Sequence, residues 1–236
     1  MTPRLSASLV VVSPARKVLF MLRPSRGSFR NTYVFPGGAQ DADDVSSVHC
    51  ALRETYEETG ILIDPNTKKS VLVKGFAETD YKRALKTYMN RNFSDIDWSH
   101  GAGFPRASQW TTPVEAGNKR FTTQFFLYNS PEEFDLSWFR KSSEAEALLW
   151  ISPAEALAEF EEGRFTMFPP QAYIMTLLKH FSQEKALEHM KDRVIVPKVI
   201  SQQDDGTIHY DWGQNEEGLV QFVKGQCVSV KYQPKL

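Results

Sequence analysis

Three glutamates, Glu54, Glu57 and Glu58, are spaced to share one face of a helix, at positions i, i+3 and i+4. Like charges at this spacing repel one another, so such a cluster calls for a counter-charge. Arg53 supplies one positive charge. A divalent cation can supply the rest, and carboxylate oxygens suit Mg²⁺ or Mn²⁺, which bind substrate phosphates. The alternative, common for an isolated Arg-Glu-x-x-Glu-Glu run, is an acidic surface that faces solvent.

The residues around the glutamates predict a single helix with a mostly apolar or small stripe on another face. That stripe consists of Val48, Ala51, Leu52, Thr55 and Thr59. Ser46 or Asp44 is expected to cap the helix at its start, because short polar side chains accept hydrogen bonds from its first free amides. Gly60 is expected to end it in the left-handed conformation. The local sequence therefore predicts both ends of this helix.

Residues 38–61 resemble the signature of the Nudix hydrolase family. That signature is Gly, five residues, Glu, seven residues, Arg-Glu, an aliphatic residue, any residue, Glu-Glu, any residue, Gly and an aliphatic residue. The matching positions are Gly38, Arg53, Glu54, Glu57, Glu58, Gly60 and Ile61, and Phe35-Pro36-Gly37-Gly38 matches the loop that usually precedes them. Two positions depart from the pattern. Asp44 stands where the first Glu is expected, with one extra residue before Arg53, and Thr55 replaces the aliphatic residue.

The resemblance implies an α+β fold in which a mixed β-sheet is sandwiched between helices (α/β/α). It also implies a pyrophosphohydrolase that uses Mg²⁺ or Mn²⁺ on a small-molecule diphosphate. Hydrolysis of a phosphoanhydride needs its charge neutralised and a water placed in line. We expect Glu54, Glu57 and Glu58 to bind metal, and the resemblance adds the Gly37 carbonyl as a ligand. Glu57 and Glu58 are also catalytic candidates, and Arg53 is expected to hold the carboxylates in place.

Members of the family use a further acid from a later loop or strand as a base or metal ligand, and the signature does not fix its position. Glu144 and Glu146, just before a strand expected at residues 147–151, are the catalytic candidates here. Glu132 and Glu133 rank lower. The alternative for each is an ordinary surface acid.

A longer resemblance, over roughly residues 5–180, is to the peroxisomal coenzyme A diphosphatase branch of the family. It rests on residues 19–24, 35–41, 110–113, 119–127, 150–153 and 168–170. It implies cleavage of coenzyme A or acyl-coenzyme A to 3′,5′-ADP and (acyl-)4′-phosphopantetheine. The 3′-phosphate would need basic partners, for which Arg23, Lys119 and Arg120 are the candidates. The alternatives are an NADH or ADP-ribose pyrophosphatase, and a catalytically inactive Nudix module that binds nucleotide.

Composition is that of an ordinary globular protein of 236 residues, with 41% hydrophobic and 24% charged residues. A net charge of −1 gives no general attraction to nucleic acid or to an anionic membrane, so neither is an expected partner. Two cysteines, Cys50 and Cys227, make no disulfide framework and fit a reducing, intracellular location. No apolar run is long enough to span a bilayer. The oligomeric state is left open by the sequence.

The last three residues, Pro234-Lys235-Leu236, differ from the peroxisomal address Ser-Lys-Leu only in the first position. They are read either as a peroxisomal signal or as an incidental tail of a cytoplasmic protein.

Two domains are expected, a Nudix domain over residues 1–192 and a β-rich extension over residues 193–236 packed on it. Expected strands cover residues 5–12, 17–22, 33–35, 61–63, 71–73, 121–128, 145–151, 194–200, 207–212, 219–223 and 227–232. Expected helices cover residues 79–91, 153–162, 169–181 and 184–191, besides the one that carries the glutamates. Residues 92–107 are expected to form a long connection, in which Trp98 and Phe104 either stack on a base or anchor the loop in the core.

Overall fold

The computed structural model describes residues 2–25, 30–73, 103–117, 119–137, 139 and 141–234. The helix expected at residues 79–91, Trp98 and the last two residues of the carboxy-terminal tripeptide lie outside these ranges.

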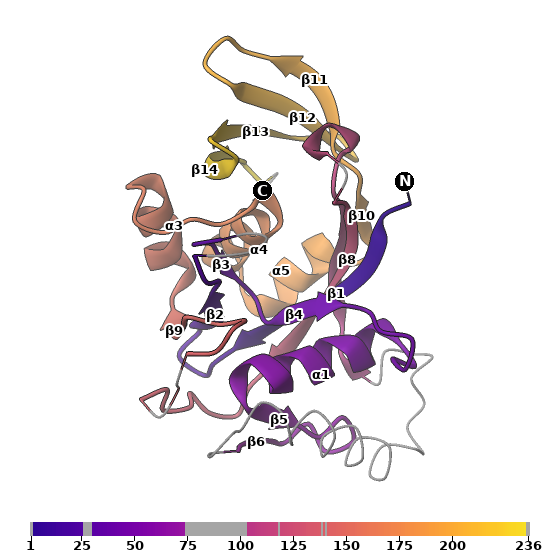
Figure 1. Ribbon diagram of the computed structural model, residues 1–236, viewed down its shortest axis with the longest axis vertical. Helices are drawn as coiled ribbons and strands as arrows, with labels where there is room; N and C mark the ends of the chain where they lie inside the picture. The colour runs from indigo at the N-terminus through magenta and orange to yellow at the C-terminus, as the bar shows by residue number, and fades with distance from the viewer. Residues whose placement is uncertain are drawn as a thin grey trace.

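An eight-stranded mixed sheet forms the centre of the fold (Figure 1). Its strands are β1 (Arg4–Val12), β2 (Val18–Leu22), β3 (Tyr33–Val34), β4 (Gly37–Ala39), β7 (Arg106–Thr111), β8 (Phe121–Asn129), β9 (Ala147–Ile151) and β10 (Arg193–Ile195). The strand order is β10-β7-β8-β1-β2-β3, with β4 paired to β1 and β9 paired to β2. β1 runs parallel to β8, and β10 parallel to β7, while the other pairs are antiparallel. The expected hairpin of the first two strands is confirmed.

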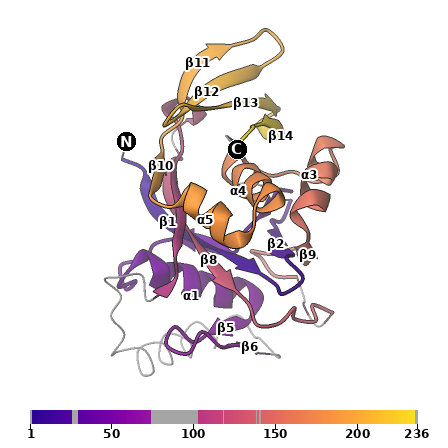
Figure 2. The ribbon, with the colours of Figure 1, turned by 180° about the vertical axis from the view of Figure 1, so that it is seen from behind.

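Helices cover both faces of this sheet, as expected for an α/β/α fold (Figure 2). They are α1 (Ser47–Thr59), α3 (Pro153–Glu161), α4 (Pro169–His180) and α5 (Gln183–Met190). Successive side chains of a strand point to opposite faces, so β1 serves two cores. Leu9 and Val11 pack with α1, and Val10 and Val12 pack with the other three helices. None of the helices in the described ranges has the length and apolar character to cross a membrane.

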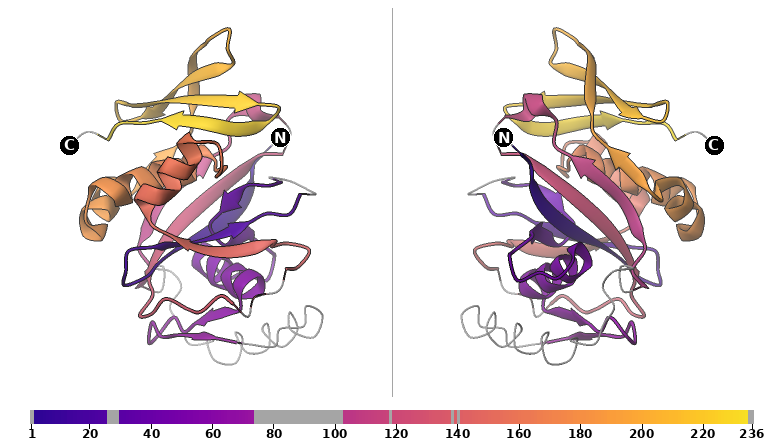
Figure 3. Two further views of the ribbon diagram at one scale, coloured as in Figure 1. Left: turned by 90° about the vertical axis from the view of Figure 1, so that its left-hand side faces the viewer. Right: turned by 90° about the vertical axis from the view of Figure 1, so that its right-hand side faces the viewer.

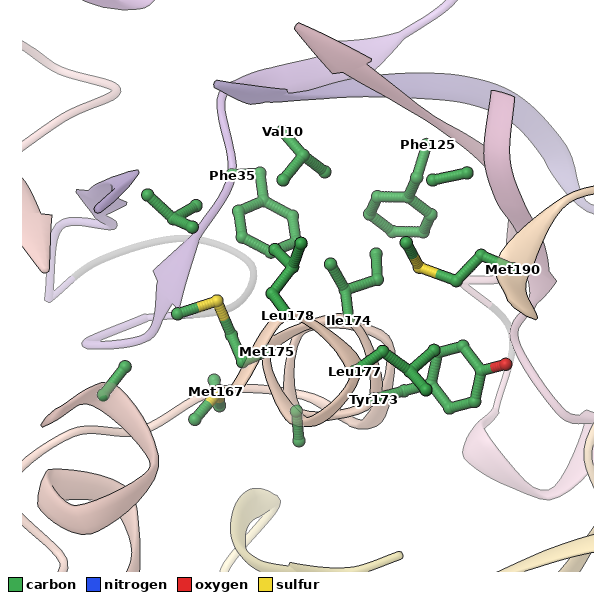
Figure 4. Packing of buried hydrophobic residues seen from close by; sticks show 14 of the residues in the cluster. Val10, Phe35, Phe125, Met167, Tyr173, Ile174, Met175, Leu177, Leu178 and Met190 are labelled. Carbon is green, nitrogen blue, oxygen red and sulfur yellow. The ribbon is translucent and has the colours of Figure 1, made fainter. Parts of the chain in front are cut away.

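The core between the sheet and α4 fixes the loop that leads into the glycine pair. Figure 4 shows Leu178 of α4 directed at Phe35, which is 1% exposed, and Ile174 of α4 lying between Phe35 and Phe125. The Phe35 ring also packs on Phe20, with ring centroids 4.8 Å apart, and on Phe125, edge to face at 6.1 Å. Because Phe35 is buried in this way, the backbone of the residues that follow it is held against the sheet.

Both ends of α1 follow the local sequence. The Ser46 side chain accepts a hydrogen bond from the His49 N–H at 3.1 Å, so Ser46, rather than Asp44, is the N-cap. Gly60 ends the helix with a φ of 71° and donates its N–H to the Tyr56 carbonyl. The hydroxyl of Thr55, which stands where the family signature has an aliphatic residue, is satisfied by the Ala51 carbonyl at 2.7 Å. Thr55 can therefore be buried in the helix without an unpaired polar group.

A two-stranded hairpin lies beyond α1, formed by β5 (Ile61–Ile63) and β6 (Ser70–Leu72). Nearby, Phe104 is 4% exposed and packs against Tyr128, with ring centroids 5.9 Å apart. Phe104 is thus an anchor of its loop in the core and has no exposed face on which a base could stack.

The carboxy-terminal residues form a separate antiparallel sheet of four strands. These are β11 (Lys198–Gln202), β12 (Thr207–Gly213), β13 (Glu216–Val223) and β14 (Gln226–Lys231). The expectation of one strand over residues 194–200 was wrong. Pro197 interrupts that run, so that β10 joins the large sheet and β11 the small one. The division of the chain at residue 193 into a Nudix domain and a β-rich extension stays a prediction.

The small sheet stacks on the layer of helices that contains α4 (Figure 3), and aromatic side chains join the two. Trp212 is 1% exposed and lies edge to face against Trp110 and Tyr173, with ring centroids 5.2 and 5.9 Å away. A side chain at Gly218 would collide with the Trp212 ring, which explains the glycine there. Arg193 and Glu216 form an ion pair in the same interface. The small sheet therefore shares a core with the rest of the chain.

Candidate active site

Helix α1 lies against β1 and β4 (Figure 1), and Glu54 and Glu58 contact Gly38 and Gly37 of β4. The carboxyl-bearing side chains of Glu54, Glu57 and Glu58 are 14%, 10% and 2% exposed. A solvated acidic surface would leave all three largely open to water. The structure thus contradicts the alternative of a solvent-exposed acidic face and shows the three glutamates as a largely buried cluster.

Arg53 is the cation that holds two of these carboxylates. Its Nη1 donates to Glu54 Oε1 at 3.0 Å and to Glu57 Oε2 at 3.1 Å. Its Nε and Nη2 donate to the two carboxylate oxygens of Asp44, at 2.8 and 2.7 Å. The planar guanidinium therefore bridges three acids at once, which the single ammonium of a lysine cannot do.

Asp44 is a buried carboxylate with all of its hydrogen-bonding capacity in use. It accepts two bonds from Arg53, one from the Asp41 N–H at 2.8 Å and one from the His49 ring at 2.9 Å. Burial alone would raise the pKa of Asp44, but the hydrogen bonds from Arg53 and His49 outweigh it and hold that pKa well below 3.8. Asp44 is therefore ionised at neutral pH and supports Arg53, in spite of its departure from the family signature.

Glu58 is fixed by the backbone of the glycine pair. Its Oε2 accepts the Gly37 N–H at 2.8 Å. Gly37 has a φ of 152°, and a side chain there would collide with Ala7 and Ser8 of β1. Gly37 and Ser8 form a non-hydrogen-bonded pair of the β1–β4 ladder. The hydrogen bonds on either side run from the Leu9 N–H to the Pro36 carbonyl and from the Gln40 N–H to the Leu5 carbonyl. The amide edge of Gly37 consequently faces away from β1, which fits its expected role as a carbonyl ligand.

Glu54 lies against Gly38. A Cβ atom built on Gly38 would come within 2.5 Å of the Glu54 carboxyl carbon and of one of its oxygens. Only glycine leaves room for the carboxylate to lie on the backbone at this point. Gly38 is thus required by the position of Glu54, whereas Gly37 is required by the closeness of β1.

Burial, together with repulsion between neighbouring carboxylates, raises the pKa of Glu54 and Glu58. Burial and then the charge of Glu57 raise the pKa of Glu54 to about 7, although Arg53 opposes the shift. Burial and then the charge of Glu54 raise the pKa of Glu58 well above its ordinary value. Arg53 and Arg23 therefore do not fully compensate the negative charge, and the site would gain from a further cation.

The donor set fits a hard divalent cation. Across the described ranges, no group of three or more histidine, cysteine or acidic side chains is already assembled around a point where an ion could sit. The glutamates instead turn to Arg53, to the Gly37 N–H and to Arg23. Their ligand atoms are all oxygens, as Mg²⁺ and Mn²⁺ prefer, and burial together with mutual repulsion raises the pKa of Glu54 and Glu58, so a cation would stabilise their charged forms. Cation binding would thus require small rotations of these side chains.

The two candidates for the distal acid are placed differently. The charge of Glu144 raises the pKa of both Glu54 and Glu58, so it lies within electrostatic reach of them. Glu146 is paired with Lys141 at 3.2 Å on the surface. The lower-ranked Glu133 is paired with Lys17 at 2.9 Å. The electrostatic influence on Glu54 and Glu58 therefore favours Glu144 over Glu146. The Ser142 hydroxyl accepts the Glu144 N–H at 3.1 Å and shapes this turn, a contact that no local sequence signal indicated.

The three basic candidates for substrate binding are also separated. Arg23 lies in the site, with its Nη1 3.4 Å from Glu58 Oε1. Arg120 immediately precedes Phe121, which is paired with Arg4 in the register of β1 and β8. At ~3.3 Å per residue, Arg4 is about 13 Å along β1 from Ser8, the partner of Gly37. Arg120 is bonded to the Thr112 carbonyl there, and its neighbour Lys119 is exposed. The structure therefore brings Arg23 to the glutamates, but not Lys119 or Arg120.

Comparison with known sequences decides the family. A sequence model described as the NUDT19 Nudix domain matches residues 44–178, more than half of the chain. The chain belongs to the Nudix hydrolase family. The site just described coincides with the residues that match the signature of this family.

The relatives of this Nudix chain are distant. It is 30% identical over 186 residues to nudix hydrolase 7 of Caenorhabditis elegans, covering 74% of this chain and 60% of that protein. It is 26% identical over 200 residues to acyl-coenzyme A diphosphatase NUDT19 of Xenopus laevis, covering 70% of this chain and 49% of that protein. It is 44% identical over only 64 residues to mitochondrial coenzyme A diphosphatase NUDT8 of Mus musculus, covering 25% of this chain and 30% of that protein. The chain thus spans less than two thirds of each of these relatives.

The Nudix fold is also shown by a solved structure. A NUDIX hydrolase from Alicyclobacillus acidocaldarius matches with a TM-score of 0.58 and 22% sequence identity, covering 80% of this chain and 96% of that chain. This confirms the expected α+β architecture.

Stability of this Nudix chain without metal should fall as the pH rises from about 4.5 to 7. In that window unfolded Glu54 loses its proton before folded Glu54, whose pKa is about 7, and the loss amounts to about 3 kcal/mol. A bound cation would replace the proton. The rise in melting temperature on adding MgCl₂ should therefore be larger at pH 8 than at pH 6, as differential scanning fluorimetry can measure. A rise of equal size at both values would contradict this assignment.

Proposed function

We propose that the chain is a metal-dependent coenzyme A or acyl-coenzyme A diphosphatase. The observation that carries the proposal is the contact between Arg23 and Glu58, since a guanidinium beside the carboxylates of the Nudix signature is suited to bind a phosphate of the substrate. Two of the distant relatives are named as diphosphatases of this substrate class. In the reaction, a water oxygen bonds to one phosphorus of the diphosphate and the bridging P–O bond breaks. The products are 3′,5′-ADP and (acyl-)4′-phosphopantetheine.

Each residue of the site has a role in this proposal. Glu54, Glu57, Glu58 and the Gly37 carbonyl would hold Mg²⁺ or Mn²⁺, which when bound neutralises phosphate charge and makes water more acidic. Arg53 keeps the carboxylates of Glu54 and Glu57 oriented between substrate encounters. Their depth in the site excludes bulk water, so charges placed there act more strongly on a phosphate than they would at the surface.

Arg23 is suited to bind one phosphate of the substrate. Its side chain is 27% exposed, and its Nε is buried without a hydrogen-bond partner in the described part of the chain. The 3.4 Å contact of its Nη1 with Glu58 is long for a charge-assisted hydrogen bond. Once a cation compensates Glu58, the guanidinium can offer its donors to phosphate oxygens at little cost.

Glu144 is the proposed general base, and its removal should be costly. Glu144→Gln is expected to lower kcat by about 10²- to 10⁴-fold, the usual range for loss of general base catalysis. Glu146→Gln should change kcat by only a few-fold, because Glu146 is engaged with Lys141 at the surface. Steady-state assays of both variants against the same substrate measure the difference. If Glu146→Gln is the more damaging change, the assignment of the distal acid is wrong.

A panel of substrates tests the proposed specificity. We expect kcat/KM to be highest for coenzyme A or an acyl-coenzyme A, lower for 3′-dephospho-coenzyme A, and lower again for NADH and ADP-ribose, with product masses corresponding to 3′,5′-ADP and 4′-phosphopantetheine. Preference for NADH or ADP-ribose would replace the proposal with a pyrophosphatase of that class. Nucleotide binding without turnover in Mg²⁺ or Mn²⁺ would indicate an inactive binding module.

A further inference from the structure

His49 contacts Asp44, the carboxylate that holds Arg53, and is not part of the family signature. It lies in the first turns of α1, is 8% exposed, and has its Nδ1 2.9 Å from Asp44 Oδ1. The signature leaves this position variable, since it falls in the spacer before Arg53.

The direction of this hydrogen bond follows from the state of Asp44. An ionised carboxylate only accepts hydrogen bonds, so the proton lies on His49 Nδ1. The neutral ring with its proton on Nδ1 and the doubly protonated ring both donate from that nitrogen. The contact therefore does not depend on the charge of His49.

His49, Arg53 and Glu57 follow one another at intervals of four residues, in one row along α1. Asp44 bridges the first two members of the row, because its Oδ1 accepts from both His49 Nδ1 and Arg53 Nε. Arg53 Nη1 in turn bonds Glu57 and Glu54. A rotation of Asp44 would accordingly move the guanidinium that orients two of the proposed metal ligands.

We propose that His49 is a positioning residue of the metal site, and that the Asp44–His49 pair does in this chain what one longer glutamate does in the family signature. An aspartate is one methylene shorter than a glutamate, and the spacer before Arg53 is one residue longer here. The His49 ring fills the space beside the short side chain and fixes its carboxylate against Arg53. The inference rests on the proposed metal site.

Binding of Mn²⁺ alone, by isothermal titration calorimetry, separates a positioning role from packing. His49→Phe keeps a ring and removes the donor, and should raise the Kd for Mn²⁺ by about 10- to 100-fold, as for other residues that orient metal ligands. His49→Asn keeps a donor close to the place of Nδ1, and should bind within about 3-fold of the unmodified chain. Val48→Ala is the matched control, since Val48 is buried in the same turn but its side chain has no hydrogen-bond donor for Asp44. Equal weakening in His49→Phe, His49→Asn and Val48→Ala would overturn the proposal.

A second pair of variants keeps the test decisive if His49→Phe does not fold. His49→Ala should weaken Mn²⁺ binding, and adding Asp44→Glu to it should restore most of the affinity, because the longer side chain can reach Arg53 without the ring. If the double variant does not regain affinity for Mn²⁺, then Asp44 and His49 do not together replace the glutamate of the family signature. Glu58→Gln distinguishes failure of the proposed metal site from failure of the role proposed for His49. If Glu58→Gln leaves Mn²⁺ binding intact, the metal site itself is wrong, whereas loss in Glu58→Gln with normal binding in His49→Phe rejects only the role of His49.

Discussion

Replacing Glu58 with glutamine should lower kcat by about a thousandfold. The change removes one charged ligand from the proposed metal site, where a bound cation supplies several kcal/mol of charge stabilisation in the transition state, and 1.36 kcal/mol corresponds to a tenfold change in rate. Steady-state assays in saturating Mg²⁺ or Mn²⁺ measure the loss. Glu57→Gln should have a similar effect, since Glu57 shares the same face of α1.

The fold should survive the Glu58→Gln change. The amide oxygen of glutamine can still accept the Gly37 N–H, and repulsion with Glu54 disappears. The melting temperature without metal should therefore be equal to or above that of the unmodified chain, while the increase on adding Mg²⁺ should vanish. Glu188→Gln, at an exposed position on α5, is the matched control and should alter neither quantity. Full activity in a Glu57→Gln, Glu58→Gln double variant would remove the basis of the metal assignment.

Replacing Arg53 with methionine should cost about 3–5 kcal/mol of folding stability, the range found when a buried ion pair loses one partner. Asp44, whose side chain is 1% exposed, would keep only the donors from His49 and Asp41. Urea denaturation at pH 7 measures the change. The stabilising effect of ionised Asp44 is present above its ordinary pKa of 3.8 and is lost as the pH falls through its lower folded value. The deficit of Arg53→Met should therefore shrink in acid.

Two variants control the Arg53 result. Arg53→Lys retains the charge but cannot bond both oxygens of Asp44 in parallel, so it should recover only part of the stability. Asp44→Asn combined with Arg53→Met removes the buried charge and should be more stable than Arg53→Met alone. If the double variant is less stable by the sum of the single effects, the two side chains are not coupled, and the described network has no energetic role.

The elements that could be predicted were those specified by residues close together in sequence. The limits of α1 follow from Ser46 and Gly60, and the start of α3 follows from the capping box of Ser152 with Glu155. The turns at Gly206 and Gly225 of the small sheet carry positive φ angles of 83° and 79°, as expected from their glycines. In each case the signal is a backbone requirement that one or two residue types satisfy.

The features that escaped prediction depend on contacts between distant parts of the chain. Strand β7 has the sequence Arg-Ala-Ser-Gln-Trp-Thr, with little β-propensity, and is a strand because it pairs with β8 on one side and β10 on the other. The division of residues 194–200 between two sheets follows from partners that a local pattern does not contain.

For the site as well, residues close together in sequence could be predicted, and contacts between distant segments could not. Helical spacing and the family resemblance were enough to bring Glu54, Glu57 and Glu58 together. The distinction between Glu144 and Glu146 depends on how the loop before β9 is folded by Ser142. The distance of Lys119 and Arg120 from Glu58 is set by the register of β8 on β1, which no short motif encodes.

The most direct test of the account is a crystal structure of the protein grown or soaked with Mn²⁺, with anomalous diffraction used to locate the ion. We expect an anomalous peak in contact with carboxylate oxygens of Glu54, Glu57 and Glu58 and with the Gly37 carbonyl. An ion bound elsewhere, with the three glutamates still paired to Arg53, Arg23 and the Gly37 N–H, would contradict it.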